Sequence, residues 1–319
     1  MASASARQGA ARPMGGKRPH PSAVRAGSAR RAGWWTPYVL VAPFFIAFLL
    51  FTVGPLLLAA YNSFFESRLV GGTSFVWFEN YAEVFTDDRF WEGFGRILLY
   101  GAVFTPLTIG LSLFLALIVD AGVVRHGGFF RTLYFVPYAI PAVVATLMWG
   151  FLYGPTISPL SDVASWLGLD SFNLLDPSVV LFSIGNVAVW TYTGYNILVF
   201  FAALRSIPAE IYEAAVLDGA GGWRIAWSIK VPMIKPVLTM VAIFSIINTI
   251  QLFTEPMVLQ PLAPRAIESN FTPNMYAYSL TAGGQQLNYV SALSFVLGAM
   301  VILMSVVYVR VTNRREADR

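Results

Sequence analysis

The 319-residue sequence contains no cysteine and two histidines, His20 and His126. Neither a disulfide nor a thiolate metal site can therefore form, and we expect no metal site. No histidine lies in a long apolar run and no His-Glu-x-x-His motif occurs, which argues against an intramembrane enzyme. A Walker A motif is also missing, because Gly15-Gly16-Lys17 lacks the earlier glycine and the following serine or threonine. The sequence predicts no catalytic residue and no nucleotide bound by this chain itself.

Charged residues are scarce: they make up 12% of the chain, whereas hydrophobic residues make up 56%. Soluble domains carry roughly 25% charged residues, so this composition indicates an integral membrane protein surrounded by a lipid bilayer. A net charge of +4 is compatible with a nucleic-acid partner, but the basic residues concentrate in the tails and beside apolar runs. Membrane topology explains that distribution better, and we expect no nucleic acid.

Six apolar runs approach or exceed the roughly 20 residues that a helix needs to cross a hydrocarbon core of about 30 Å. Alternation of polar and apolar residues is absent, and an open sheet could not satisfy its backbone groups in lipid. The expected fold class is an all-α integral membrane protein with six transmembrane helices. These are predicted at residues 37–64, 97–119, 132–153, 179–204, 236–259 and 290–309.

Lysine and arginine are distributed unequally between the two sides of the predicted spans. Seventeen of the 21 lie in segments 1–33, 120–131 and 205–235 or from residue 310 onward, and the other side has four. The positive-inside rule then places both termini and the connection 206–236 in the cytoplasm.

We divide the chain into a tail, a membrane domain and a second tail. Residues 1–36 are basic and rich in small residues, which predicts a disordered cytoplasmic tail. The apolar run that follows is too long for a signal peptide. The membrane domain is predicted at 37–312, with a short cytoplasmic tail at 313–319.

The connection 206–236, called the elbow below, is too polar to lie in hydrocarbon. Pro208 is suited to the first turn of a helix, and Glu213 lies in the helix that follows. Gly219 should end that helix, because glycine adopts positive φ at little cost. A second helix is expected from Trp223 to about residue 231, ended by Pro232.

The spacing Glu213-Ala214-Ala215, Gly219, Ile229 and Pro232 resembles the EAA loop of binding-protein-dependent ABC importer permeases, with Val231 where leucine is usual. The resemblance implies that the elbow between the fourth and fifth spans forms coupling helices, which dock on a cytoplasmic ATPase. The alternative is an interfacial helix without a coupling role. Candidate coupling residues are Glu213, Ala214, Ala215, Asp218, Gly219, Gly222, Ile229 and Pro232.

The resemblance covers about residues 36–312. Phe78-Glu79-Asn80-Tyr81 with Phe85, segment 129–149 and segment 276–295 are similar to the sugar-uptake branch, specifically the first permease of maltose and glycerol-phosphate importers. It implies a bacterial or archaeal inner membrane, a second permease subunit, two ABC ATPases that bind ATP and Mg, and an extracytoplasmic solute-binding protein. No cofactor is then expected in this chain.

One departure from the pattern limits what the resemblance implies about substrate. The family commonly has a Thr-x-Gly-Gly-Pro turn after the fifth span, but this chain continues with Leu259-Gln260-Pro261-Leu262 and a longer external segment, 259–289. A sugar or oligosaccharide is the expected substrate class, and glycerol-3-phosphate or another polyol or sugar phosphate stays open.

Polar residues within the spans are candidates for the substrate path, because such residues tend to face the bundle or a water-filled path. Asn248, Gln251 and Glu255 are spaced by three and four, which predicts one helical face. The alternative is that these amides hydrogen-bond between helices, or that Glu255 anchors the span. The path candidates are Asn186, Trp190, Tyr192, Asn196, Asn248, Gln251 and Glu255.

The first external loop, 66–95, mixes aromatic and acidic residues and predicts an amphipathic helix on the outer membrane surface. That helix could brace the bundle or contact the binding protein. A competing function is an ion-coupled transporter, but such carriers usually have intramembrane acids and matching halves, and the spans contain essentially only Glu255.

Overall fold

The computed structural model describes residues 35–68, 71–122, 127–154, 166, 173–283 and 286–317. The chain divides into two compact units, Met1–Gly54 and Pro55–Arg319. In the first unit, helix α1 (Thr36–Phe48) continues into the π-helical segment η1 (Leu49–Val53). Their apolar side chains are largely exposed, as expected for a helix that faces lipid.

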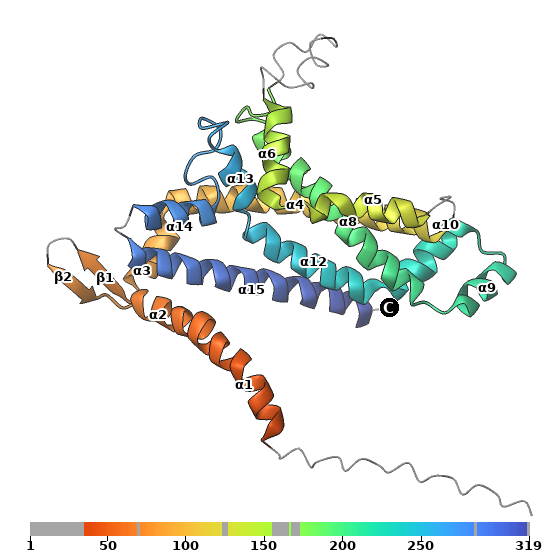
Figure 1. Cartoon of the computed structure of the whole chain (residues 1–319), viewed down its shortest axis with the longest axis horizontal. Helices are drawn as coiled ribbons and strands as arrows, with labels where there is room; N and C mark the ends of the chain where they lie inside the picture. Colours follow the sequence, from red (N-terminus) through yellow and green to blue (C-terminus); the bar gives the residue numbers. More distant parts are fainter. Residues whose placement is uncertain are drawn as a thin grey trace, which may run out of the picture. The chain divides into compact units, whose positions relative to one another are not determined.

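The second unit begins in helix α2 (Gly54–Asn62) and is built mainly from helices. α4 packs along α8 and α12, and α12 also contacts α8 and α15, so that α12 lies between α8 and α15 in Figure 1. A shorter helix, α5, lies against α8. These elements are α4 (Asp88–Asp120), α5 (Gly127–Ala139), α8 (Val180–Arg205), α12 (Lys235–Ile250) and α15 (Leu287–Ala317).

In the described part of the chain, five helices are long and apolar enough to cross a membrane, and a bent pair would make a sixth. The prediction of a multi-helix membrane protein is confirmed at this level. The third predicted run is not a single helix, however. α5 and α6 (Ala142–Tyr153) are bent by 97°. The helix breaks at Pro141 between them, because the backbone of this residue is extended.

The all-α prediction is wrong at one short place. Strands β1 (Phe65–Arg68) and β2 (Gly72–Phe75) form an antiparallel hairpin in the loop that was predicted to be the first external one. The predicted amphipathic helix follows it as α3 (Glu79–Thr86). The Asn80 side chain ties the helix to the hairpin by donating hydrogen bonds to the carbonyl oxygens of Ser63 and Phe65, at 2.8 and 2.9 Å.

The fifth predicted span is interrupted. α12 ends at Ile250, a short non-helical stretch follows, and α13 (Thr254–Leu259) resumes the helix. Asn274 donates a hydrogen bond to the carbonyl oxygen of Ile250 at 2.8 Å and so satisfies one of the carbonyls freed by the break. Asn274 belongs to α14 (Pro273–Ala282), a helix inside the segment 259–289 that is predicted to be external.

The two predicted tails fall mostly outside the described residues. Residues 1–34 and 318–319 are not among them, so the disordered tail stays a prediction. At the other end, α15 continues through the predicted boundary at 312 to Ala317. Its end lies at the same end of the unit as the elbow, as the positive-inside prediction requires of two cytoplasmic segments (Figure 1).

Two separate apolar clusters form the interior of the second unit. The larger cluster includes Phe90, Ile184 and Met275, from α4, α8 and α14. The smaller cluster includes Phe200, Leu204 and Ile234, next to the elbow.

Candidate functional site

A cavity of about 360 Å³ lies between the two apolar clusters. Its wall includes Tyr100 and Phe104 from the larger cluster and Val241 from the smaller one. α4, α5, α8 and α12 all contribute side chains, and the break after α12 closes one side. A volume of this size is typical of sites that hold a small organic molecule.

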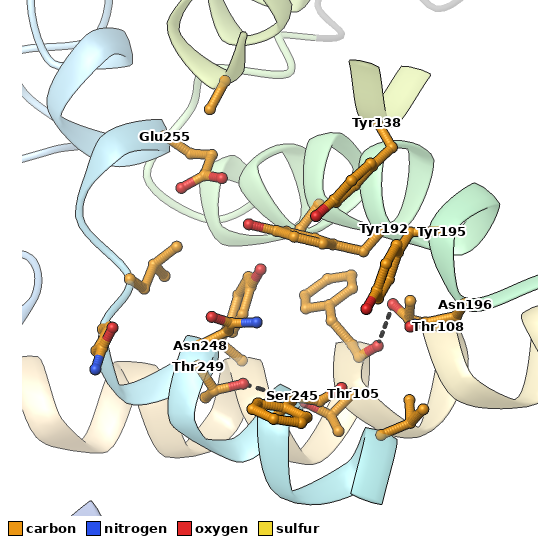
Figure 2. A pocket seen from close by; sticks show the side chains of 18 of the residues that line it. Thr105, Thr108, Tyr138, Tyr192, Tyr195, Asn196, Ser245, Asn248, Thr249 and Glu255 are labelled. Carbon is orange, nitrogen blue, oxygen red and sulfur yellow. Dashed lines mark hydrogen bonds between the residues drawn. The ribbon is translucent and has the colours of Figure 1, made fainter. Parts of the chain in front are cut away.

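Tyrosines make up one side of the cavity. The rings of Tyr138, from α5, and Tyr195, from α8, are stacked with centroids 4.7 Å apart, and Tyr192 lies 6.3 Å from Tyr138. Figure 2 shows these three rings together, with Asn248 and Ser245 of α12 across the cavity. Aromatic faces opposite hydrogen-bonding groups suit a ligand with both C–H faces and hydroxyls.

Small polar side chains complete the wall. Thr105 and Thr249 share a hydrogen bond of 3.1 Å between their hydroxyls, which joins α4 to the end of α12. The carboxylate of Glu255 points towards the cavity from the first turn of α13 (Figure 2). Among the described lining residues, Glu255 is the one with a carboxyl group, and none is lysine or arginine.

The structure brings five of the seven path candidates to this cavity, namely Tyr192, Asn196, Asn248, Gln251 and Glu255. Asn248, Gln251 and Glu255 do not share one continuous helical face, because Gln251 caps α12 and Glu255 belongs to α13. They meet because the chain turns between the two helices. Whether they contact substrate stays a prediction.

The other two candidates have neighbours away from the cavity. Asn186 donates a hydrogen bond of 2.7 Å to the hydroxyl of Tyr153, and Trp190 packs edge-on against Trp149. Both contacts join α8 to α6, which is the helix-bridging alternative for polar residues in a span. The sequence interpretation missed Tyr138, Thr105 and Thr249 as lining residues. For Tyr138, the one feature of the sequence that pointed to a lining position was its neighbour Pro137. A single threonine in an apolar run, such as Thr105 or Thr249, gives no such indication.

The elbow has the predicted first helix. α9 (Ala209–Leu217) begins after Pro208 and carries Glu213, Ala214 and Ala215. Asp218 caps it, and Gly219 has a φ of +78°, a conformation in which a side chain is strained. The turn therefore needs glycine at position 219 for its backbone.

The second helix of the elbow differs from the prediction. It starts at Gly222 as α10 (Gly222–Ile225), widens into the π-helical segment η2 (Ala226–Lys230), which contains Ile229, and continues as α11 (Val231–Met233). Pro232 lies inside α11 and does not end the helix at its own position. The N–H of Val231 bonds to the carbonyl of Ala226, so a π turn comes directly before the proline and accommodates its missing donor.

The surface of the elbow is unusually apolar for an exposed connection. Leu217 is 88% exposed and Trp223 71% exposed, with Val216 and Trp227 also exposed nearby. The two tryptophan rings lie 5.6 Å apart. Glu213 and Ala214 are exposed as well. Exposed apolar groups gathered on a polar connection are typical of a surface that binds a partner.

The sequence model for the inner membrane component of binding-protein-dependent transport systems matches residues 108–316. The chain belongs to this family. The matched range includes α4 from Thr108, the elbow and most of the cavity wall. This permease is therefore a multi-pass membrane transport subunit and not an enzyme.

Two curated relatives show how this permease compares along its length. It is 32% identical over 279 residues to the sn-glycerol-3-phosphate transport system permease protein UgpA of Salmonella typhimurium, which covers 86% of this chain and 93% of UgpA. It is 29% identical over 246 residues to the diacetylchitobiose uptake system permease protein NgcF of Streptomyces coelicolor, which covers 73% of this chain and 69% of NgcF.

The fold has a counterpart among solved structures. A chain of the bacterial alginate ABC transporter, crystallised in complex with an alginate pentasaccharide-bound periplasmic protein, superposes with a TM-score of 0.76. The match covers 88% of this permease and 94% of that chain at 20% sequence identity. The helical arrangement is thus that of an ABC importer permease.

Proposed function

We propose that this permease takes up a neutral sugar or oligosaccharide through the central cavity, in an importer driven by partner ATPases. The observation that carries the proposal is the cavity wall, in which tyrosine rings face amide and hydroxyl side chains and no basic residue occurs among the described lining residues. Stacked rings such as Tyr138 and Tyr195 offer apolar faces to a sugar ring, and Asn196, Asn248 and Gln251 offer donors and acceptors to its hydroxyls.

The charge of the cavity favours a neutral sugar over a sugar phosphate. Phosphate is usually bound by arginine, lysine or converging backbone N–H groups. Glu255 adds a carboxyl group to this wall, which supplies no positive charge to a phosphate. The relative UgpA is named for glycerol-3-phosphate and NgcF for a disaccharide. The described cavity wall fits the second kind of ligand.

We assign the coupling of transport to ATP hydrolysis to the elbow. α9 presents Glu213 and Ala214 on its surface, and Leu217 and Trp223 extend the apolar area beside the Gly219 turn. We assign the cytoplasmic docking of an ABC ATPase to this surface, with ATP and Mg bound by that partner. The complete importer then contains a second permease, two ATPases and an extracytoplasmic binding protein, and both termini of this chain are cytoplasmic.

The coupling role is tested with Glu213→Arg and Gly219→Trp in the importer purified with its ATPase. The first reverses a charge on the exposed surface of α9, and the second adds bulk and backbone strain at the turn. Both variants should remain in the membrane, but stimulation of ATP hydrolysis by the solute-loaded binding protein should be lost. Glu268→Arg, which reverses an exposed charge in the segment predicted to be external, is the matched control. Normal stimulation in both test variants would contradict coupling through the elbow.

The path is tested by replacing Asn248, Gln251 and Glu255 together with alanine. Transport rate or preference among a panel of neutral mono- and oligosaccharides should change. The matched control is Asn186→Ala, because Asn186 contacts Tyr153 and is not among the lining residues. If the triple variant transports the same sugars at the same rates, these residues do not line the path.

A further inference from the structure

A buried ion pair joins the elbow to the membrane helices. Asp120 is the last residue of α4, and its side chain is only 6% exposed. Its Oδ2 contacts the Nζ of Lys230, the last residue of η2, whose side chain is 13% exposed. Its Oδ1 lies 3.3 Å from the Nε of Arg205 at the end of α8, but that side chain is 62% exposed. Of the two cations, Lys230 is the buried partner.

The same lysine also contacts the first helix of the elbow. Its Nζ lies 4.7 Å from the ring centroid of Tyr212 in α9. The Tyr212 hydroxyl donates a hydrogen bond of 3.2 Å to the carbonyl oxygen of Leu204, next to Arg205. Lys230 therefore lies between the carboxylate of Asp120 in α4 and the ring of Tyr212 in α9. Through these contacts, both helical parts of the elbow, α9 and η2, are connected to the ends of α4 and α8.

Apolar contacts also join the elbow to the bundle. Ile207 and Ile234 belong to the smaller cluster together with Leu113 and Phe200. Apolar contacts are non-directional, so they allow one surface to shift against another. A buried ion pair does not, because separating its members leaves an uncompensated charge out of water. The pair of Asp120 and Lys230 thus fixes the end of η2 against the end of α4.

We propose that the Asp120–Lys230 ion pair transmits movement of the elbow to α4, and through α4 to the cavity. α4 provides the cavity wall at Tyr100, Phe104, Thr105 and Thr108, so a displacement of its end changes that wall. Asp120 and Lys230 are positioning residues, since neither contacts the cavity. The inference rests on the proposed coupling role of the elbow.

The test uses a single thiol as a reporter of the cavity. Because the chain has no cysteine, Ser245→Cys introduces its one thiol, at a lining position. The reporter is placed in the importer purified with its ATPase, and its labelling rate by a maleimide is measured on this chain without nucleotide and with ATP and vanadate. We expect the two labelling rates to differ, because closure of the ATPases should change the exposure of the cavity.

Removing the ion pair should abolish that difference. Lys230→Met and the double variant Asp120→Asn/Lys230→Met should give equal rates in both states while the ATPase still co-purifies. The double variant leaves no unpaired buried charge, so it remains informative if the single variant folds poorly. Lys230→Arg keeps the pair and should preserve the nucleotide-dependent difference. Arg205→Gln is the matched control, because it removes the exposed cation from the same carboxylate, and it should also preserve the difference.

The outcomes separate this inference from the function on which it rests. A full nucleotide effect in the double variant would overturn the role of the ion pair and leave coupling through the elbow intact. No nucleotide effect in the reporter with an unaltered ion pair would contradict coupling between the ATPase and the cavity, and the ion-pair role with it.

Discussion

Gly194 of α8 packs directly against the backbone carbonyl oxygen of Tyr134 in α5, so closely that no Cβ atom fits between them. This contact brings the two helices together next to the cavity. One turn further along α5, Tyr138 stacks on Tyr195, the residue after Gly194. A small residue in α8 therefore determines where the tyrosine side of the cavity lies.

Gly194→Ala should destabilise the permease, because its Cβ would overlap the Tyr134 carbonyl and α5 would have to move. Such overpacking typically costs about 1–3 kcal/mol. The expected result is a lower melting temperature in detergent, together with altered sugar preference. Gly110→Ala is the control, since a Cβ there meets nothing within 4 Å. Equal melting temperatures for the two variants would show that α5 and α8 are not held at this contact.

Asp87 makes the stability of the folded protein depend on pH in the acidic range. Its Oδ2 accepts hydrogen bonds from the hydroxyls of Tyr276 and Tyr289, at 2.7 and 2.6 Å, and its Oδ1 accepts one from the N–H of Arg89. Burial of the carboxyl alone would raise its pKa. The hydrogen bonds that it accepts outweigh this effect together, so the pKa of Asp87 lies below its ordinary value of 3.8. Burial and Asp87 in turn raise the pKa of Tyr276 to about 12, so it stays a donor at neutral pH.

A lowered pKa in the folded state means that this stabilisation is complete above pH 3.8 and is lost as the pH falls further. The melting temperature should therefore fall towards pH 3 in the wild type, and less so in Asp87→Asn. Glu92→Gln, which changes an exposed carboxylate nearby, should retain the wild-type pH dependence. Identical pH profiles for wild type and Asp87→Asn would contradict this account of the Asp87 site.

A substitution at Leu217 tests docking without disturbing folding, because the side chain of Leu217 is almost fully exposed. Leu217→Ala should leave the melting temperature of the chain unchanged, yet reduce the amount of ATPase that co-purifies. A central residue of a docking surface contributes about 2 kcal/mol or more, which corresponds to roughly 30-fold weaker binding. The same change at Leu262, an exposed leucine of the predicted external segment, should not affect ATPase recovery. Equal recovery from the two variants would place the docking surface elsewhere.

Features that depend on the backbone preference of a single residue were the most predictable part of the structure. Pro208 and Gly219 act through their own backbone preferences, so the sequence located the start and end of α9. Pro232 was wrong as a helix end, because a π turn directly precedes it and accommodates the missing N–H. The 97° bend at Pro141 exceeds what a proline alone specifies, since kink angles depend on the packing of neighbouring helices.

Contacts between distant residues could not be predicted. The helical spacing of Asn248, Gln251 and Glu255 pointed to one region, but a break in the chain brings them together, not a shared face. Asn186 had the same polar character and instead bonds to Tyr153. Asp120 lies 110 residues from Lys230 in sequence. An acid at the end of an apolar run gives no indication of which of several basic residues it will meet.

Mild-detergent purification of the tagged chain, with mass spectrometric identification of the proteins that co-elute, tests the importer assignment most directly. The account predicts an ABC ATPase, a second permease and a solute-binding protein, in a complex whose sugar uptake requires ATP. Recovery of the chain alone, stable and active in uptake driven by an ion gradient, would contradict it.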